Sequence, residues 1–176
     1  MNENADSSAE ERWLPVVGYE GRYSISSRGR VRSEDRFFLR NGYQVRVRSR
    51  ILKPIVMKSG GYHSVGLCAN GSVQSRKVHA LVLEAFVGPR PSGMEVCHNN
   101  GVPTDNRLEN LRYDTASANQ LDKVIHGTHH NARKTHCKRG HEFTQANTYY
   151  SPNKVNVREC LTCKQGRDFQ RSARAA

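Results

Sequence analysis

The chain has 176 residues, of which 36% are hydrophobic, and its mean hydropathy is −0.76. These values allow one domain or a few small modules, and they leave little apolar material for one large core. The sequence contains no apolar run close to the roughly 20 residues that a membrane-spanning helix needs. Residues 1–11 lack the basic start and the apolar stretch of a signal peptide. We therefore expect a flexible acidic tail at 1–11, no membrane partner and a cytoplasmic location.

Positive charge is concentrated in two parts of the sequence. Lys and Arg number 28 against 16 Asp and Glu, a net charge of +12. Residues 12–90 carry a net charge of +11 and residues 131–176 carry +7, whereas residues 91–130 carry −2. Basic surfaces bind polyanions by neutralising phosphates and releasing counterions, while a cation site needs oxygen ligands and little competing positive charge. This distribution favours two nucleic-acid-binding arms beside a cation-binding centre, although excess charge can also serve solubility alone.

Residues 12–57 have the pattern of a small β-rich module. Short β-prone pieces punctuated by glycines predict antiparallel strands at Leu14–Val17, Tyr23–Ser26 and Arg30–Ser33. In residues 43–48, apolar side chains alternate with Gln44, Arg46 and Arg48, so a strand would have one apolar and one basic face. Ile51–Met57 is interrupted by Lys53 and Pro54 and predicts an edge or crossover. The side chains expected to contact DNA here are Arg28, Arg30, Arg32, Arg46, Arg48 and Arg50.

Residues 58–93 predict a hairpin and then a helix. Tyr62–Cys68 and Val73–Val78 are strand-like runs on either side of an Asn70-Gly71 pair, a strong hairpin signal. Apolar residues at helical spacing then form a buried stripe, closed by prolines, at Val78, Leu81, Val82, Ala85 and Phe86. His79 lies beside this stripe, where a packing or capping role is expected.

The segment MEVCHNNGVPTDNRLENLRYDTASANQ holds the most specific pattern. Asn110 follows His98 by twelve residues, and Asn119 follows nine residues later. This spacing resembles the HNH motif of phage and intron-encoded endonucleases, which forms a β-hairpin and a helix around one divalent ion. The preceding text VHALVLEAFVGPRPSGMEV is similar to the stretch that usually precedes this motif. WLPVVGYEGRYSISSRGRVRS resembles NUMOD4, a small module thought to bind DNA. The resemblances together cover about residues 12–130.

The resemblance implies a role for each residue of the motif. His98 is the base, because an imidazole with a pKa of about 6.5 can take a proton from water at neutral pH. Asn119, on the helix expected over residues 115–125, is a ligand of one divalent ion, Mg²⁺ or Mn²⁺. Such an ion neutralises the charge that develops on the phosphate. Asn110 bridges the hairpin loop through an amide that both donates and accepts.

Cys97 departs from the family pattern. The residue before the histidine is often Asp or Asn in this family and can be the second protein ligand, whereas a thiolate suits Mg²⁺ poorly. Three arrangements are open. Asn119 holds the ion with substrate oxygens and water, a carboxylate such as Asp105 or Asp114 substitutes, or a softer ion such as Mn²⁺ is preferred. Cys97 is equally compatible with a small buried residue. Further histidines that could reach the phosphate are His126 and His129.

A second metal site is expected near the C-terminus. Cys137-x3-His141 and Cys160-x2-Cys163 are separated by eighteen residues, and four such ligands suit tetrahedral zinc. The text resembles the small zinc ribbons of some phage HNH proteins. A β-hairpin with its turn at residues 152–154 would join the two pairs. The site is expected to be structural because protein atoms fill all four positions.

We therefore expect an α+β protein that cuts double-stranded DNA. Its modules are a NUMOD4-like module at 12–57, a ββα-metal nuclease at 58–130 and a basic zinc ribbon at 131–176. A homing endonuclease of phage origin, acting in the host cytoplasm, is favoured. A monomer would nick one strand. The rivals are a catalytically weakened DNA-binding regulator with an HNH fold and a phage packaging or restriction nuclease. In the zinc ribbon, the residues expected to contact DNA are Lys138 and Arg139.

Overall fold

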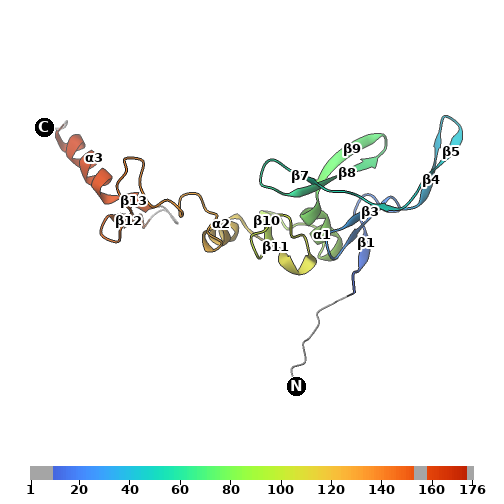
Figure 1. Ribbon diagram of the computed structural model, residues 1–176, viewed down its shortest axis with the longest axis horizontal. Helices are drawn as coiled ribbons and strands as arrows, with labels where there is room; N and C mark the ends of the chain where they lie inside the picture. Colours follow the sequence, from blue (N-terminus) through green and yellow to red (C-terminus); the bar gives the residue numbers. More distant parts are fainter. Residues whose placement is uncertain (1–9, 153–157, 174–176) are drawn as a thin grey trace, which may run out of the picture. The chain divides into compact units, whose positions relative to one another are not determined.

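The computed structural model describes residues 10–152 and 158–173 (Figure 1). The chain divides into two compact units, residues 1–126 and 127–176. Both units contain strands and helices, which confirms the expected α+β class. Of the expected acidic tail, only Glu10 and Glu11 are described, and the Glu11 carboxylate is paired with the Arg30 guanidinium. In the described ranges, every helix is too short or too polar to cross a membrane.

The first unit begins with a four-stranded antiparallel sheet in the order β1-β2-β3-β6. Its strands are β1 (Trp13–Pro15), β2 (Tyr23–Ser26), β3 (Val31–Ser33) and β6 (Arg50–Ile51). The three strands expected in residues 14–33 are thereby confirmed, to within a residue or two at their ends. Gly29 turns the chain between β2 and β3 with a positive φ of 76°, a conformation that suits glycine.

A separate two-stranded hairpin extends away from this sheet (Figure 1). It consists of β4 (Arg36–Arg40) and β5 (Tyr43–Val47). Asn41 and Gly42 both have positive φ at its turn, as a tight hairpin turn requires. The alternation expected in β5 is confirmed by the register, which pairs Val45 with Phe38 on one face and Arg46 with Phe37 on the other. β4 was not expected, because its three consecutive apolar residues do not alternate with polar ones.

The second part of this unit is a three-stranded sheet in the order β7-β8-β9, followed by a helix. The elements are β7 (Ile55–Val56), β8 (His63–Ala69), β9 (Ser72–Lys77) and α1 (Val78–Phe86). The hairpin predicted at Asn70-Gly71 is confirmed, with both residues at positive φ. The apolar stripe of α1 is also confirmed, since Val78, Leu81 and Val82 are fully buried.

One hydrophobic core joins residues 12–57 to the segment that follows. It draws side chains from β2, β3, β8, α1 and the later strand β11 (Leu111–Thr115), among them Ile25, Val31, Leu67, Leu81 and Leu111. The hydroxyl of Tyr23 also accepts a hydrogen bond from the backbone N–H of Cys68 at 3.1 Å. Sharing one core gives both parts a larger buried interior than a module of about 50 residues forms alone.

The first unit ends with a hairpin and a helix. The elements are β10 (Met94–His98), the 3-10 turn η1 (Leu108–Asn110), β11 (Leu111–Thr115) and α2 (Ala116–Ile125). β10 and β11 are antiparallel, with His98 opposite Leu111. Thr115 caps α2 by accepting a hydrogen bond from the N–H of Ala118 at 3.2 Å. The helix expected over residues 115–125 is therefore confirmed.

The second unit is a short hairpin and a helix. They are β12 (Thr148–Tyr150), β13 (Arg158–Cys160) and α3 (Leu161–Ala173). β12 and β13 are antiparallel, as expected. Of the expected turn at residues 152–154, positions 153 and 154 lie outside the described residues. The helix α3 was not expected, because its sequence is polar and shows no strong apolar stripe.

Candidate active site

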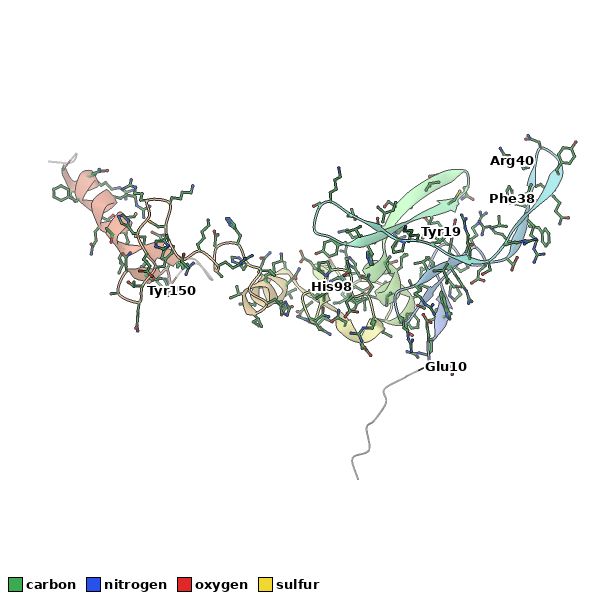
Figure 2. The ribbon with its side chains drawn as sticks, viewed as in Figure 1. Glu10, Tyr19, Phe38, Arg40, His98 and Tyr150 are labelled. Atoms are coloured by element: carbon green, nitrogen blue, oxygen red, sulfur yellow. The ribbon has the colours of Figure 1, made fainter. Side chains whose placement is uncertain are left out.

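His98 lies at the end of β10, near the middle of the first unit (Figure 2). Its side chain is only 8% exposed. The ring lies 5.2 Å, centroid to centroid, from His79 of α1 and 5.9 Å from Tyr62. Aromatic neighbours on one side and the hairpin on the other therefore hold the imidazole in a fixed orientation.

Asn106 determines which nitrogen of His98 carries the proton. Asn106 is 4% exposed, and its Nδ2 donates to the carbonyl of Thr104 at 3.1 Å, which orients the amide. Its Oδ1 then faces His98 Nε2 at 3.4 Å. An amide oxygen accepts but does not donate, so Nε2 carries the hydrogen and the lone pair lies on Nδ1. The same Nδ2 also donates to His63 Nδ1 at 3.3 Å.

Burial favours the neutral form of both buried histidines. Burial is the main cause that lowers the pKa of His98, against a raising contribution from the hydrogen bond to Asn106. Burial, together with the nearby His98 and Lys77, lowers the pKa of His79 to about 3. Among the described residues, His79 Nδ1 is a buried atom with no hydrogen-bond partner. A neutral imidazole at His98 is the form that accepts a proton.

Asn110 connects the two ends of the loop between the strands of the hairpin. Its Nδ2 donates to Asn100 Oδ1 at 3.0 Å and to the carbonyl of Asp105 at 2.8 Å. Its Oδ1 accepts from the N–H of Asn100 at 3.0 Å. The loop that carries Asn106 is thus tied to the strand that follows it. The spacing of the motif in the sequence identified Asn110 but not Asn106.

The hairpin has two chemically different faces. Residues opposite each other in an antiparallel pair lie on the same face, so Val96, His98, Leu111 and Tyr113 share the face toward the core. The other face faces α2, and its residues are Glu95, Cys97, Arg112 and Asp114. His98 therefore lies on the core face of the hairpin, whereas Asn119 of α2 contacts Glu95 on the opposite face.

Asn119 meets the hairpin on the face toward α2. Its Nδ2 donates to Glu95 Oε2 at 2.5 Å. Arg112 crosses the same face, with its Nε 2.9 Å from Asp114 Oδ2 and another guanidinium nitrogen 2.5 Å from Asp122 Oδ2 of α2. The amide oxygen of Asn119 is a hard donor and fits Mg²⁺ or Mn²⁺. This face, rather than the core face, thus holds the residues suited to a divalent ion.

Cys97 is enclosed between the hairpin and α2. Its side chain is 2% exposed. Burial raises the pKa of the Cys97 thiol; the nearby Arg112 opposes this effect, and the surrounding carboxylates add to it. A buried, protonated thiol is a poor ligand for a hard cation. Of the two roles that the sequence allowed for Cys97, metal ligand and small buried residue, these surroundings fit the second.

The remaining histidines are engaged elsewhere. His126 follows α2, and its Nε2 is 3.1 Å from the carbonyl of Asn99. His129 belongs to the second unit, where its Nδ1 accepts from the N–H of Ala132 at 3.2 Å. The His126 contact joins the end of α2 to the segment after β10, whereas the His129 contact is local to one turn.

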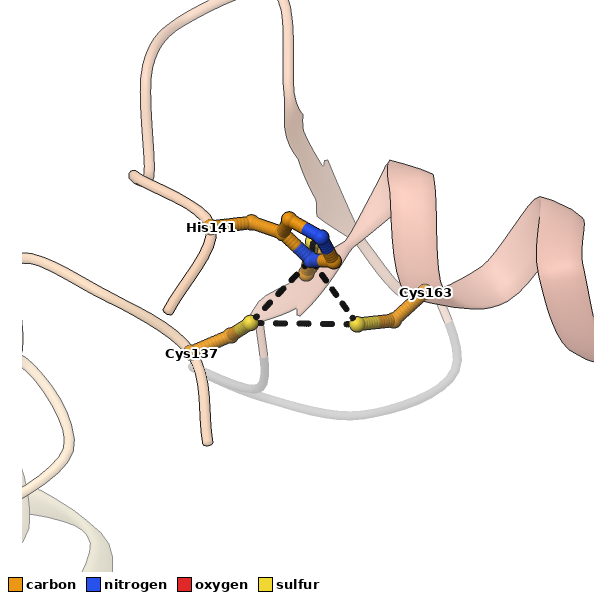
Figure 3. A group of neighbouring side chains, drawn as sticks. Cys137, His141 and Cys163 are labelled. Carbon is orange, nitrogen blue, oxygen red and sulfur yellow. Dashed lines mark hydrogen bonds between the residues drawn. The ribbon is translucent and has the colours of Figure 1, made fainter. Parts of the chain in front are cut away.

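In the second unit, Cys137, His141, Cys160 and Cys163 converge (Figure 3). Their ligand atoms all lie within 4.8 Å of one another. Cys137 Sγ is 3.7 Å from Cys163 Sγ, and His141 Nδ1 is 3.3 Å from Cys163 Sγ and 3.6 Å from Cys160 Sγ. Zn–S bonds of about 2.3 Å at tetrahedral angles give S···S separations of about 3.8 Å. The expected ligand set thus has the dimensions of a zinc tetrahedron.

Of the basic side chains expected to contact DNA, Arg32, Arg46 and Arg50 lie on strands, and the others lie in turns and connecting segments. The Arg32 guanidinium stacks over Trp13 at 4.4 Å from the ring centroid, and Arg46 lies over Phe37 of the β4–β5 hairpin at 5.8 Å. Arg46 is also 3.2 Å from Asp35. Phe38 and Arg40 mark the projecting end of that hairpin (Figure 2). Lys138 and Arg139 follow the first cysteine of the zinc cluster.

A strand ending in a buried neutral histidine, a loop bridged by asparagine and a helix bearing a hard ligand define an HNH-type ββα unit. Two family models agree with this geometry. The NUMOD4 motif matches residues 11–68, and the HNH endonuclease model matches residues 76–121. Residues 11–68 therefore carry a NUMOD4 motif, and residues 76–121 match the HNH endonuclease family.

Known proteins match the same region. DNA endonuclease I-HmuI of Bacillus phage SP01 is 32% identical over 116 residues, which cover 66% of this chain and 59% of that protein. The uncharacterized HNH endonuclease L247 of Acanthamoeba polyphaga mimivirus is 34% identical over 118 residues, which are 64% of this chain and 26% of that protein. A solved structure described as DNA binding and cleavage by the HNH homing endonuclease I-HmuI aligns with a TM-score of 0.53 at 32% identity. It covers 66% of this chain and 60% of that chain. The chain thus spans less than two thirds of these relatives.

Proposed function

We propose that this protein is a metal-dependent endonuclease that hydrolyses a phosphodiester of double-stranded DNA at a preferred site. The observation that carries the proposal is the neutral, oriented imidazole of His98 at the end of β10, 3.4 Å from Asn106. A DNA-cleaving phage relative of 32% identity supports it. A monomer with one such site nicks one strand, and a homing endonuclease acting in the cytoplasm of a phage-infected host is the setting that the relative favours.

In this proposal His98 is the base. Its Nε2 donates to Asn106, so Nδ1 is the atom that takes the proton from the attacking water. Asn106 and Asn110 act as positioning residues, the first through His98 directly and the second through the loop. Asn119 is a ligand of a divalent ion, Mg²⁺ or Mn²⁺. Such an ion, when bound, would neutralise negative charge on the phosphate. The phosphate in this proposal binds at the end of β10, next to His98.

The remaining parts of the chain bind DNA in this proposal. The arginines of residues 12–57 and the exposed β4–β5 hairpin neutralise phosphates on one side of the cleavage site. The second unit, held by one structural Zn²⁺ on its three cysteines and one histidine, adds Lys138 and Arg139. The proposed modules are residues 12–57, 58–130 and 131–176, with the first two sharing one core.

A DNA-binding regulator without catalysis is the second candidate, because buried Cys97 occupies the position of a metal ligand in this family. Supercoiled plasmid incubated with the protein and Mg²⁺ or Mn²⁺ separates the two. The nuclease produces nicked circles, and His98→Ala abolishes nicking while it retains DNA binding. Binding without nicking in any of these metals favours the regulator. Mapping the cut then separates one preferred site, typical of homing, from the scattered sites of a packaging or restriction nuclease.

A further inference from the structure

Three carboxylates lie around the face between the hairpin and α2. These carboxylates differ in whether a basic side chain of the protein is paired with them. Asp114 and Asp122 are both paired with Arg112, at 2.9 and 2.5 Å. Within residues 10–152 and 158–173, no arginine or lysine forms an ion pair with Glu95. Glu95 is therefore the carboxylate of this face that Arg112 does not hold.

Glu95 is also the carboxylate that contacts Asn119. The 2.5 Å separation joins Glu95 Oε2 to the Asn119 amide, and a half-turn of this amide about its last bond exchanges nitrogen for oxygen. Two oxygen ligands of Mg²⁺ at about 2.1 Å and right angles lie about 3 Å apart. The pair at 2.5 Å would therefore have to separate by only about 0.5 Å to act as two neighbouring ligands of one hard cation.

The other candidate ligands are less suited to this position. The Cys97 side chain is 2% exposed and offers a soft donor. Asp105 lies in the loop, where Arg107 Nε is 2.9 Å from its Oδ1. Asp114 and Asp122 would each have to give up Arg112 to bind an ion.

We propose that Glu95, together with Asn119, supplies the protein ligands of the divalent ion, and that Cys97 does not bind it. This assignment rests on the proposed metal-dependent nuclease function. In this chain, the carboxylate ligand is Glu95 instead of the residue at position 97. The two positions are two residues apart on β10, so their side chains lie on the same face of the strand. The buried thiol then serves packing alone.

Mn²⁺ alone is the probe, because the free ion gives an electron paramagnetic resonance signal that disappears on binding. The full chain, loaded with Zn²⁺, is titrated with Mn²⁺ as the unaltered protein and as Glu95→Gln, Cys97→Ser and Glu109→Gln. Glu109→Gln is the matched control, because it removes one exposed carboxylate of the same hairpin region, paired with Arg107. We expect Glu95→Gln to weaken Mn²⁺ binding at least tenfold and the other two variants to stay within twofold. Glu95→Asp, which keeps a carboxylate, should restore part of the affinity.

The nicking assay reports on the same ion independently. Glu95→Gln should raise the Mn²⁺ concentration for half-maximal nicking at least tenfold, with DNA binding retained as the check on folding. Unchanged Mn²⁺ affinity in Glu95→Gln, or loss of it in Cys97→Ser, overturns the assignment. If nicking requires His98 and Mn²⁺ but is unchanged in Glu95→Gln, the ligand assignment is overturned and the proposed nuclease function stands. Nicking that is indifferent to His98→Ala overturns the proposed function as well.

Discussion

The backbone of Gly29 lies directly against Asn106, with no room for a side chain between them. A Cβ built on Gly29 would lie 2.6 Å from Asn106 Cβ and 2.8 Å from its carbonyl oxygen. Gly29 belongs to the turn between β2 and β3, within the stretch matched by NUMOD4, while Asn106 orients His98. The N-terminal module therefore supports the base of the proposed nuclease through backbone contact.

Gly29→Ala should reduce the nicking rate at least tenfold, because the new methyl group displaces Asn106 and with it His98. Gly18→Ala is the matched control. Gly18 also has a positive φ, 78° against 76°, but nothing lies within 4 Å of its Cβ position. Both variants should lose about 1 kcal/mol of stability from backbone strain. Equal nicking rates in the two variants would contradict this coupling.

The pH dependence of nicking should report on His98. Burial lowers the pKa of His98 below the usual value of 6.5, so the neutral base persists to lower pH. The acid limb of log kcat/KM against pH should therefore lie below 6.5. Asn106→Asp places a negative charge beside the ring, which favours the imidazolium form and raises the pKa. The limb should then move to higher pH, and a limb that does not move would argue against contact between these side chains.

Stability should fall in acid because of His79. Its pKa is about 3 in the folded protein and about 6.5 when unfolded, so between these values the unfolded state binds more protons. Stability therefore rises with pH across this window, by up to about 1.4 kcal/mol per pH unit from this residue. Urea unfolding of the unaltered protein and His79→Phe at pH 4 to 7 tests this. The variant should show a shallower slope, and parallel slopes would refute it.

Removing zinc should unfold the second unit. Burial and the neighbouring thiols raise the pKa of Cys163 to about 11, whereas hydrogen bonds lower that of Cys160 to about 6. Without a cation, Cys163 therefore keeps a proton that a bound ion displaces. Cys137→Ser should lower the zinc content from one ion per chain, reduce helical circular dichroism through loss of α3, and weaken DNA binding. Cys68→Ser is the control, because Cys68 lies in β8, outside the cluster. A Cys137→Ser protein that retains one tightly held zinc ion would contradict this ligand set.

Local patterns in the sequence were sufficient for much of the fold. The turn at Asn70-Gly71, the stripe of α1 and the spacing of the zinc ligands each depend on residues close in the chain, and each is found in the structure. α3 and β4 were missed, because a polar helix and a strand with three consecutive apolar residues show no period that distinguishes them from loop.

By itself, the sequence determined the positions of His98, Asn110 and Asn119, because their spacing is a property of the chain. Tertiary structure decided what surrounds them. Asn106 and His79 contact His98, and Gly29 contacts Asn106. These contacts form only when strands and a helix from three parts of the chain pack together. The pleat of β10 likewise turns Glu95 toward Asn119 and His98 away from it, since neighbouring side chains on a strand point to opposite faces.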